Sequence, residues 1–250
     1  MYLGQVIAVT SGKGGTGKTT TVAAVSSCLA ALGYKTLCID FDSGLKNLDL
    51  ALCMTDFTVA DFTDVADGRL SLLEACHESP QLQNLFFLAA PTFSGYEEPD
   101  AESIGPMIDS IRSEFDYCLI DSPAGIGPGF RLANAYADMS IIVTNGELPA
   151  IRDAQRAADE VRKMGVGDIR LLVNRVKPEN FKRIRTTIDD VIDTVGARLI
   201  GAVQEDESVF QSLHENILLI LYNRRSAAYN FLDVARRVTG EDVPLRLRRK

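Results

Sequence analysis

The sequence of 250 residues lacks the marks of several classes of protein. Its apolar runs, such as Ile217–Tyr222, are far shorter than the roughly 20 residues that a helix needs to span a bilayer. Its five cysteines are few for a disulfide scaffold and show no CxxC spacing. Its two histidines, His77 and His214, lie far apart and have no ligand-like neighbours, so no zinc site is predicted.

The charge of the chain and its first residues indicate its compartment and its partners. No basic, apolar leader opens the chain, and together with the odd number of cysteines this indicates a reducing, cytoplasmic compartment. Acidic residues outnumber basic ones, 34 to 26, for a formal net charge of −8, so nucleic acid is not expected as a partner. A content of 46% hydrophobic residues excludes an intrinsically disordered chain.

Short apolar runs alternate with longer helical patterns along the chain. This alternation predicts an α/β fold with a mostly parallel, twisted sheet of about 7–8 strands and helices on both faces. Residues 1–250 are expected to form a single domain that ends in a short basic tail over residues 243–250. The predicted strands are Gln5–Thr10, Thr36–Asp40, Leu85–Ala90, Tyr117–Asp121, Ser140–Thr144, Arg170–Asn174 and Leu199–Val203, with an eighth candidate at Ile217–Leu221. The predicted helices are Thr19–Leu32, Ala150–Met164, Phe181–Val195 and Ser226–Val238, and Pro91–Pro106 is predicted to be an inserted loop.

The strongest signal is the stretch Gly12-Lys13-Gly14-Gly15-Thr16-Gly17-Lys18-Thr19, which satisfies the pattern G-x-x-x-x-G-K-[ST]. It follows the first predicted strand and opens the first long helix, as a phosphate-binding loop requires. Glycine allows backbone N–H groups to turn inward and bind phosphate oxygens at the positive end of the helix. The stretch and the adjacent Thr20 are therefore predicted to bind a nucleotide, as in P-loop NTPases. Lys18 is expected to reach the β- and γ-phosphates, and the Thr19 hydroxyl to bind Mg²⁺.

Charged residues outside this core pattern extend the predicted site. Lys13 is a lysine that an ordinary phosphate loop does not need, and a cation there is predicted to act on a phosphate of a neighbouring subunit. Asp121 ends an apolar run, a position that suits an outer ligand of Mg²⁺ at the carboxyl end of a parallel strand. Asp40 and Asp42 follow another such run and are predicted to reach the same edge, where either orients the attacking water or holds Mg²⁺ through water.

The stretch Lys13–Thr19 is the deviant form of the Walker A motif of the ParA/MinD ATPases, and the chain resembles this family from about residue 4 to about residue 245. Further stretches look most like the MinD branch; they are Ile39–Asp49, Asp121–Ile126, Ile151–Ala154 and Gly201–Val209. The resemblance implies a Mg²⁺-dependent ATPase that dimerises on ATP and hydrolyses it slowly. It also implies cycling between the cytoplasm and the inner face of the cell membrane, with a role in placing the bacterial division septum.

The same resemblance implies roles for residues that act on the phosphates. Lys13, Lys18 and Asp42 would form the catalytic group. Lys13 would cross an ATP-bound dimer to the partner's phosphates, while Lys18 and Thr19 would bind phosphate and Mg²⁺. Asp42 would position the hydrolytic water and contribute to the metal site, and Asp121 would be the Walker B acid that also serves Mg²⁺.

Other implied contacts lie further from the phosphates. Asn174, after an apolar strand, would contact adenine, with Arg175 beside it in the nucleotide site. The helix that carries Asp153 would bind regulators similar to MinC and MinE. MinD proteins usually continue into an amphipathic membrane helix, which the stretch Val243–Arg248 is too short to form, so only a weak contact of Arg246–Lys250 with anionic membrane is expected.

Two alternatives remain open from the sequence. A ParA-like or flagellar-number ATPase, acting in DNA partition or polar positioning, has the same motif, although the acidic composition argues mildly against DNA. A metabolic ligase of the same fold is the second alternative. The nitrogenase iron protein is excluded, because the loop Gly125–Gly129 has no cysteine to hold a cluster.

Overall fold

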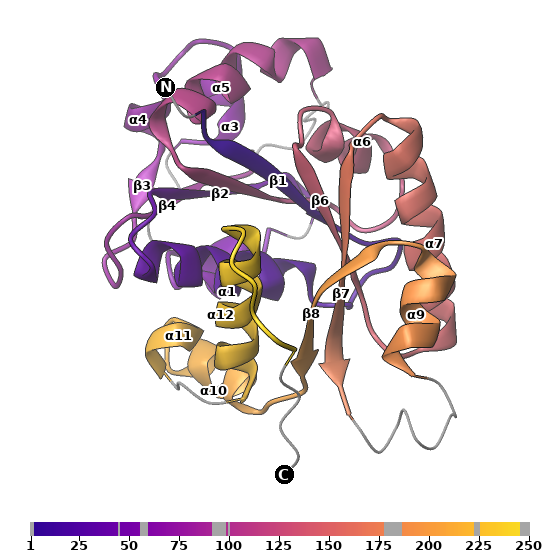
Figure 1. The fold of residues 1–250 in the computed structure, drawn as a ribbon. Helices are drawn as coiled ribbons and strands as arrows, with labels where there is room; N and C mark the ends of the chain where they lie inside the picture. The colour runs from indigo at the N-terminus through magenta and orange to yellow at the C-terminus, as the bar shows by residue number, and fades with distance from the viewer. Residues whose placement is uncertain are drawn as a thin grey trace.

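The computed structural model describes residues 3–44, 46–55, 60–91, 99, 101–177, 187–222 and 226–245, and within them eight strands form one sheet. The strand order is β3-β4-β2-β5-β1-β6-β7-β8 (Figure 1). Seven of these strands are parallel, and β3 pairs antiparallel with β4 at one edge. The predicted α/β fold with a mostly parallel sheet is confirmed. The strands are β1 (Gln5–Thr10), β2 (Thr36–Asp40), β3 (His77–Glu78), β4 (Leu85–Leu88), β5 (Tyr117–Asp121), β6 (Met139–Thr144), β7 (Asp168–Val176) and β8 (Arg198–Gln204).

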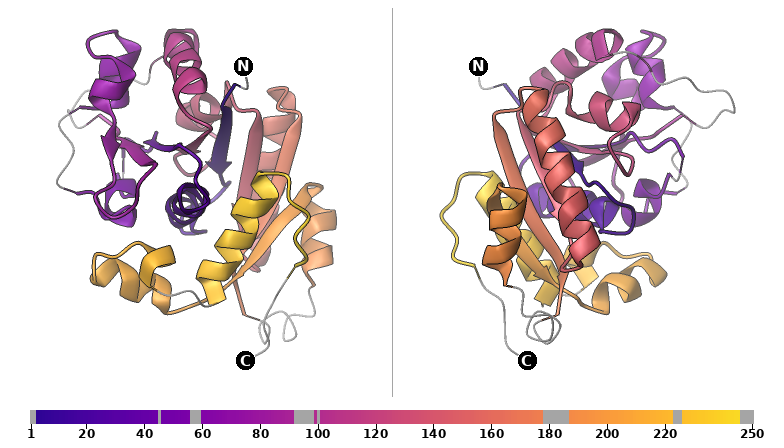
Figure 2. Two further views of the ribbon diagram at one scale, coloured as in Figure 1. Left: turned by 60° about the vertical axis from the view of Figure 1, so that its left-hand side comes forward. Right: turned by 90° about the vertical axis from the view of Figure 1, so that its right-hand side faces the viewer.

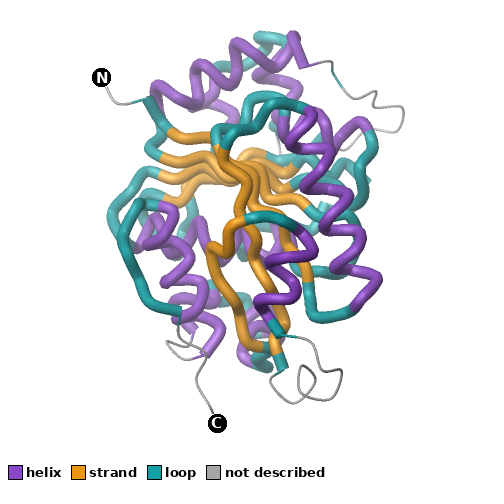
Figure 3. The backbone as a smooth tube through the Cα atoms, turned by 45° about the vertical axis from the view of Figure 1, so that its right-hand side comes forward, coloured by secondary structure: helices purple, strands orange, loops and turns teal. Residues whose placement is uncertain are grey.

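Helices cover both faces of the sheet, as Figures 2 and 3 show. Because both faces are buried, the strands are apolar on successive residues: Val6 and Ile7 are both fully buried, in different core clusters. One face carries α1 (Lys18–Ala31), α2 (Leu48–Ala51), α10 (Ser208–His214), α11 (Leu219–Tyr222) and α12 (Ser226–Val238). The other carries α3 (Phe62–Ala66), α4 (Leu72–Ala75), α5 (Ala101–Glu114), α6 (Pro128–Asn134), α7 (Leu148–Lys163) and α9 (Ile188–Val195).

The eighth strand was predicted at the wrong place. The run Ile217–Leu221 is not a strand, because Leu219–Tyr222 forms α11. A short apolar run fits a strand and a buried helix equally well, so packing decides between them. Here Leu218 and Ile220 are buried in the core that surrounds α1, whereas Leu221 is 45% exposed. The eighth strand is β3, whose two residues are too few to show a periodicity.

Two further predictions need correction at their boundaries. The prediction of a loop at Pro91–Pro106 is wrong from Ala101 onward, because α5 begins there and includes Pro106. Residues 92–98 and 100 lie outside the described residues. An apolar stripe on α5 packs onto the sheet and overrides the proline; its buried members are Ile104, Met107, Ile108 and Ile111. Of the helix predicted at Phe181–Val195, the described part begins at Ile188 after a Thr187 cap, and residues 178–186 lie outside the described residues.

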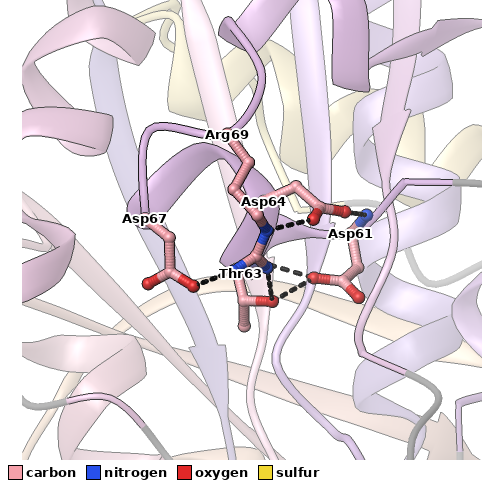
Figure 4. Close-up of polar contacts among 5 residues, drawn as sticks. All are labelled: Asp61, Thr63, Asp64, Asp67 and Arg69. Carbon is pink, nitrogen blue, oxygen red and sulfur yellow. Dashed lines mark hydrogen bonds and ion pairs between the residues drawn. The ribbon is translucent and has the colours of Figure 1, made fainter.

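A cluster of polar side chains fastens the short helix α3 (Figure 4). Asp61 is the N-cap residue, and its Oδ1 accepts a hydrogen bond of 2.8 Å from the Thr63 N–H. The Asp64 Oδ2 accepts one of 3.0 Å from the Asp61 N–H, which completes a capping box. Arg69 donates to both Asp64 and Asp67. The Asp61 N–H and Arg69 lower the pKa of Asp64, so this acidic cluster is held by structural contacts.

The described part of the C-terminal tail lies against α12. Arg237 donates hydrogen bonds of 2.9 Å to the Val243 carbonyl and 3.0 Å to the Pro244 carbonyl. The basic residues Arg246–Lys250, for which membrane contact is predicted, lie outside the described residues. Within the part of the chain that the structure describes, no helix has the length and apolar character needed to cross a membrane.

Candidate functional site

Parallel strands bring their carboxyl ends to one edge of the sheet, and the predicted site residues gather there. Strand β1 lies between β5 and β6, and the loop that follows it runs directly into α1. In the β2–β5 ladder Asp40 lies opposite Asp121, and in the β1–β5 ladder Val9 lies opposite the same aspartate. This register places the two strand-end acids beside the phosphate loop.

The phosphate loop has the backbone that its glycines predict. Gly15 and Gly17 lie in the left-handed region, with φ of 78° and 96°, which glycine adopts without steric strain. Gly17 is the N-cap residue of α1, so the loop turns into the positive end of that helix. Lys18 is the first residue of α1 and is 7% exposed. Burial lowers the pKa of its amine, while the charges of Asp121 and Asp42 oppose this shift.

Two carboxyl groups at the strand ends, those of Asp121 and Asp40, are buried and lie on paired residues. The pKa of Asp121 is raised to about 7, chiefly because the group is buried, although the Thr19 hydroxyl and Lys18 favour its charged form. The pKa of Asp40 is raised to about 8, first by burial and second by the charge of Asp121. The Asp42 N–H donates a hydrogen bond of 2.8 Å to Asp40 Oδ1. The site therefore disfavours the charged forms of these two carboxyl groups, and a bound cation would favour them.

The residues predicted to hold Mg²⁺ lie together. The Thr19 hydroxyl favours the charged form of Asp121 and so lowers its pKa, and Thr19, Asp121 and Asp42 line the same cleft. The Asp121 Oδ1 is buried without a hydrogen-bond partner, which is unfavourable unless a cation or donor binds there. Among the residues described, no cluster of three or more His, Cys, Asp or Glu side chains can hold a metal. Mg²⁺ commonly binds through one or two carboxylates together with substrate phosphates, so this donor set fits Mg²⁺ held jointly with a nucleotide.

Asn174 and Arg175 lie near the end of β7 and contact the phosphate loop directly. Asn174 is 5% exposed, and its Nδ2 donates a hydrogen bond of 2.9 Å to the Thr16 carbonyl. The Arg175 Nη1 donates one of 3.4 Å to the Gly15 carbonyl, from a residue whose own φ is 54°. Both residues line the cleft above the loop. The structure thus places them at the predicted nucleotide site and gives them loop contacts that the sequence did not indicate.

A cleft of about 1070 Å³ lies over the phosphate loop. Its volume is at the upper end of the range for cofactor sites, on the order of 300–1,000 Å³. Predicted site residues line this cleft; they are Gly14, Gly15, Gly17, Lys18, Thr19, Thr20, Asp42, Asp121, Asn174 and Arg175. Further lining residues were not predicted as site residues, although most lie in the stretches Ile39–Asp49 and Gly201–Val209 that carry the resemblance; they include Asn47, Leu50, Gln204, Glu205, Asp206, Glu207, Val209 and Phe210. The position of Gln204–Glu207 after a predicted strand could have identified them, since the same rule selected Asp121.

Gly12, Lys13 and Thr16 belong to the motif but are not among the residues that line this cleft. Lys13 extends away from it, and its Nζ lies 3.4 Å from the Glu147 Oε2, with both side chains exposed. Gly12 packs against α7, because a Cβ at this position would lie 2.1 Å from the Asp153 carbonyl oxygen. The phosphate loop and the N-terminal part of α7 are therefore in direct contact.

The arrangement suits the binding of a nucleotide triphosphate. A helix N-terminus and a buried lysine amine attract phosphate oxygens, while carboxylates and a threonine hydroxyl offer oxygen ligands to Mg²⁺. In phosphoryl transfer, catalysis comes chiefly from positioning and from stabilisation of negative charge. Lys18 is the buried cation of this cleft, Asp121 and Thr19 offer oxygen atoms of the kind that bind Mg²⁺, and Asp42 lines the same cleft.

Comparison with known proteins agrees with this geometry. The family model of the CobQ/CobB/MinD/ParA nucleotide binding domain matches residues 7–220 of the chain. The chain is 39% identical over 246 residues to the septum site-determining protein MinD of Thermotoga maritima, across 97% of this chain and 91% of that protein. The match extends over nearly the full length of both chains.

Solved structures show the same likeness. A chain of the MinC:MinD cell division protein complex of Aquifex aeolicus is similar with a TM-score of 0.90 and 35% identity, over 97% of this chain and 98% of that chain. The septum site-determining protein MinD of Pyrococcus horikoshii, complexed with Mg-ADP, is similar with a TM-score of 0.80 and 28% identity. That match covers 94% of this chain and 96% of the other.

Proposed function

Because the chain belongs to the CobQ/CobB/MinD/ParA family of nucleotide-binding proteins, we propose that it is a MinD-like ATPase switch. It binds ATP with Mg²⁺, dimerises on ATP, hydrolyses ATP slowly, and regulates placement of the division septum together with partner proteins at the membrane. One observation carries this proposal. The loop Gly12–Thr19 follows β1, which pairs with the strand that ends in the buried acid Asp121, and Lys18, Thr19 and Asp121 line one cleft.

Each residue of the site has a role in this proposal. Lys18 and the N–H groups of Gly12–Thr19 and Thr20 bind the phosphates, and Lys13 reaches the phosphates of the partner subunit. Thr19, Asp42 and Asp121 hold Mg²⁺, which when bound neutralises phosphate charge. Asp42 also orients the attacking water.

Asn174 and Arg175 complete the nucleotide site on the base side. Both line the cleft, and the Arg175 Nη2 lies 3.8 Å from the Oε1 of Glu205, another lining residue. Their proposed role is to contact adenine. The cleft is also lined by the apolar side chains of Val209 and Phe210, which suit the face of a purine ring.

The helix α7 is the proposed docking element for regulators similar to MinC and MinE. Its Asp153 carbonyl packs against Gly12 of the phosphate loop, so a change of nucleotide can be transmitted to the helix. Arg156 and Asp153 form an exposed ion pair of 3.6 Å on this helix. The MinC partner of the Aquifex aeolicus protein motivates the proposal for this chain.

A ParA-like partition or flagellar-number ATPase is the runner-up function, with the same family model as its support. The septum-site relative is 39% identical over nearly the whole chain, which favours the MinD-like function. The net charge of −8 also disfavours DNA as a partner. Retention of the protein on DNA that required ATP and fell with salt would reverse this preference.

Substitution of Lys13 tests the proposed dimer. We expect the wild-type protein to elute as a dimer from gel filtration with ATP and Mg²⁺ and as a monomer with ADP. Lys13→Ala is expected to remain a monomer in both cases while still binding ATP, because Lys13 is not among the residues lining the cleft of its own subunit. A wild-type protein that binds ATP and stays monomeric would contradict the dimer proposal.

Lys35→Ala is a matched control for this experiment. Lys35 forms an exposed ion pair of 3.6 Å with Glu114, similar to the 3.4 Å pair of Lys13 with Glu147. Lys35 precedes β2, so it lies at the amino ends of the parallel strands, whereas the phosphate loop lies at their carboxyl ends. Both substitutions remove a lysine and its ion pair, and Lys35→Ala also removes the contact of its Nζ with the Phe115 ring at 4.8 Å, so only the loss of Lys13 should abolish the dimer.

The basic residues Arg246–Lys250 motivate a proposal of weak contact with anionic membrane. Each basic residue near an anionic membrane surface contributes about 1 kcal/mol of binding free energy. One copy of the tail therefore binds weakly, and a dimer presents two copies to the same membrane. The protein should therefore sediment with anionic vesicles more strongly in ATP than in ADP. Equal sedimentation in both nucleotides would refute the proposed cycling to the inner face of the membrane.

A further inference from the structure

A bulge in β7 turns two successive residues toward the phosphate loop. The parallel pairing of β7 with β8 joins Val173 to Ala202 and then Val176 to Gln204, so three steps on β7 match two on β8. The extra residue falls at Asn174 and Arg175, and Arg175 takes a left-handed φ of 54° that is uncommon for a residue with a side chain. Bulges of this kind redirect side chains and occur next to functional sites.

The bulge holds the Asn174 amide in one orientation. Its Oδ1 accepts a hydrogen bond of 2.9 Å from the Arg175 N–H, and its Nδ2 donates one of 2.9 Å to the Thr16 carbonyl. The residue is 5% exposed, so water cannot readily replace either contact. A Cβ at Gly17 would lie 2.1 Å from the Asn174 Nδ2. The glycine therefore leaves the space that this amide fills.

These contacts determine which way one peptide group of the loop faces. The chain has no cis peptide bond among its described residues, and in a trans peptide the carbonyl and the N–H point to opposite sides. With the Thr16 carbonyl fastened to Asn174, the Gly17 N–H points away from β7. Gly17 lines the cleft, so this N–H faces the space proposed for the nucleotide phosphates.

Arg175 has a weaker contact of the same kind with the preceding peptide. Its Nη1 donates to the Gly15 carbonyl at 3.4 Å, and its side chain is 54% exposed. This contact turns the Thr16 N–H away from β7 as well. Two successive N–H groups that face one side form a concave binding site for an anion.

We propose that Asn174 is a positioning residue for ATP binding, which holds the Thr16–Gly17 peptide so that the Gly17 N–H faces the phosphates. This role is in addition to contact with adenine and rests on the proposed function of the loop. It differs from a base contact in one measurable respect. Positioning of the loop affects every nucleoside triphosphate equally, whereas a contact with adenine affects ATP alone.

The test uses Asn174→Ala and Asn174→Asp, with the dissociation constants of Mg-ATP and Mg-GTP measured by titration calorimetry. Loss of one buried hydrogen bond corresponds to about a tenfold change. We expect both constants to rise by at least about tenfold, and the constant for Mg-ATP to rise by the larger factor because Asn174 also contacts adenine in the proposed function. Asn174→Asp should be the weaker binder, because a carboxylate cannot donate to the Thr16 carbonyl and repels phosphate. It has nearly the same shape as asparagine, so the test does not depend on whether the alanine variant folds.

Hydrogen exchange of the nucleotide-free protein gives a second readout. The amides of residues 12–21 should exchange faster in both variants, while the sheet core exchanges as in the wild type. Arg175→Ala should weaken binding by less than about threefold because its contact is long and exposed. Lys177→Ala is the control, since Lys177 pairs with Glu205 at 2.9 Å and is not among the residues lining the cleft, and it should change neither readout.

Unchanged exchange over residues 12–21 in the Asn174 variants would overturn the proposal. So would a loss of ATP affinity with GTP affinity unchanged, which would leave Asn174 with a base contact alone. A wild-type protein that binds neither nucleotide would contradict the proposed ATPase function, and hydrogen exchange would still decide whether Asn174 holds the loop.

Discussion

Lys18→Ala should lower the affinity for Mg-ATP by at least about a hundredfold. The Lys18 amine is buried beside Asp121 and Asp42 at the end of the phosphate loop. Its removal deletes a charge-assisted contact with phosphate and leaves the two carboxylates to repel the nucleotide; losing one partner of a buried charge pair costs about 3–5 kcal/mol. Titration calorimetry with Mg-ATP measures the change.

Lys13→Ala is the comparison for Lys18→Ala, since both replace a lysine of one motif. Lys13 is not among the residues lining the cleft and forms an exposed ion pair with Glu147. Its alanine variant should therefore bind ATP as a monomer, with an affinity close to that of the wild-type monomer. Far-UV circular dichroism should show that both variants are folded. Binding of ATP by Lys18→Ala within tenfold of the wild type would contradict the assignment of this cleft to the triphosphate.

Asp40→Asn should stabilise the nucleotide-free protein at pH 8 and have little effect near pH 4. In the folded protein the pKa of Asp40 is raised from its ordinary value of 3.8 to about 8, by burial first and by the charge of Asp121 second. Between these values the folded state binds the proton and the unfolded chain releases it, so this group makes stability fall as pH rises. One pKa unit corresponds to about 1.4 kcal/mol, so the effect reaches several kcal/mol at pH 8.

Asparagine removes this titration and keeps an oxygen that accepts the hydrogen bond from the Asp42 N–H. Thermal unfolding in chelator should show a Tm for Asp40→Asn at least about 5 °C above the wild type at pH 8, with the difference shrinking toward pH 4. Asp109→Asn, an exposed aspartate on α5, is the matched control and should give no such trend. The same Tm difference at both pH values would show that the carboxyl group of Asp40 is not held in its protonated form.

The contribution of Asp121 to stability should also fall as pH rises, over a narrower pH range than that of Asp40. Its pKa is raised to about 7, so its contribution to stability is lost between about pH 4 and pH 7. Mg²⁺ with a nucleotide would favour the charged carboxylates, so stabilisation by Mg-ATP should increase with pH over this range.

The local parts of the site were predictable because they are contiguous in sequence. Gly12–Thr19 lies between a strand and a helix, and Gly15 and Gly17 have the left-handed backbone that a glycine-rich loop predicts. Asp121 was predictable because it ends a buried run, and parallel strands end at a common edge. Gln204–Glu207 also follow a predicted strand and line the cleft, but the sequence indicated them only through the resemblance of Gly201–Val209 and not as predicted site residues.

Short elements were harder to predict, because periodicity needs length. The run Ile217–Leu221 has the composition of a buried strand, yet packing against the core around α1 makes it part of a helix. The two residues of β3 had no pattern to detect. In both cases the deciding contacts come from segments that are distant in sequence.

By itself, the sequence determined the parallel α/β architecture, the phosphate loop and the acids at its edge, because periodicity and local backbone preference encode these features. Only the tertiary structure decided that Asn174, 158 residues from Thr16, fastens the phosphate loop, and that α7 touches it at Gly12. The physical reason is that a bulge and a close backbone contact depend on how distant strands and helices pack. No local pattern of residues specifies such packing.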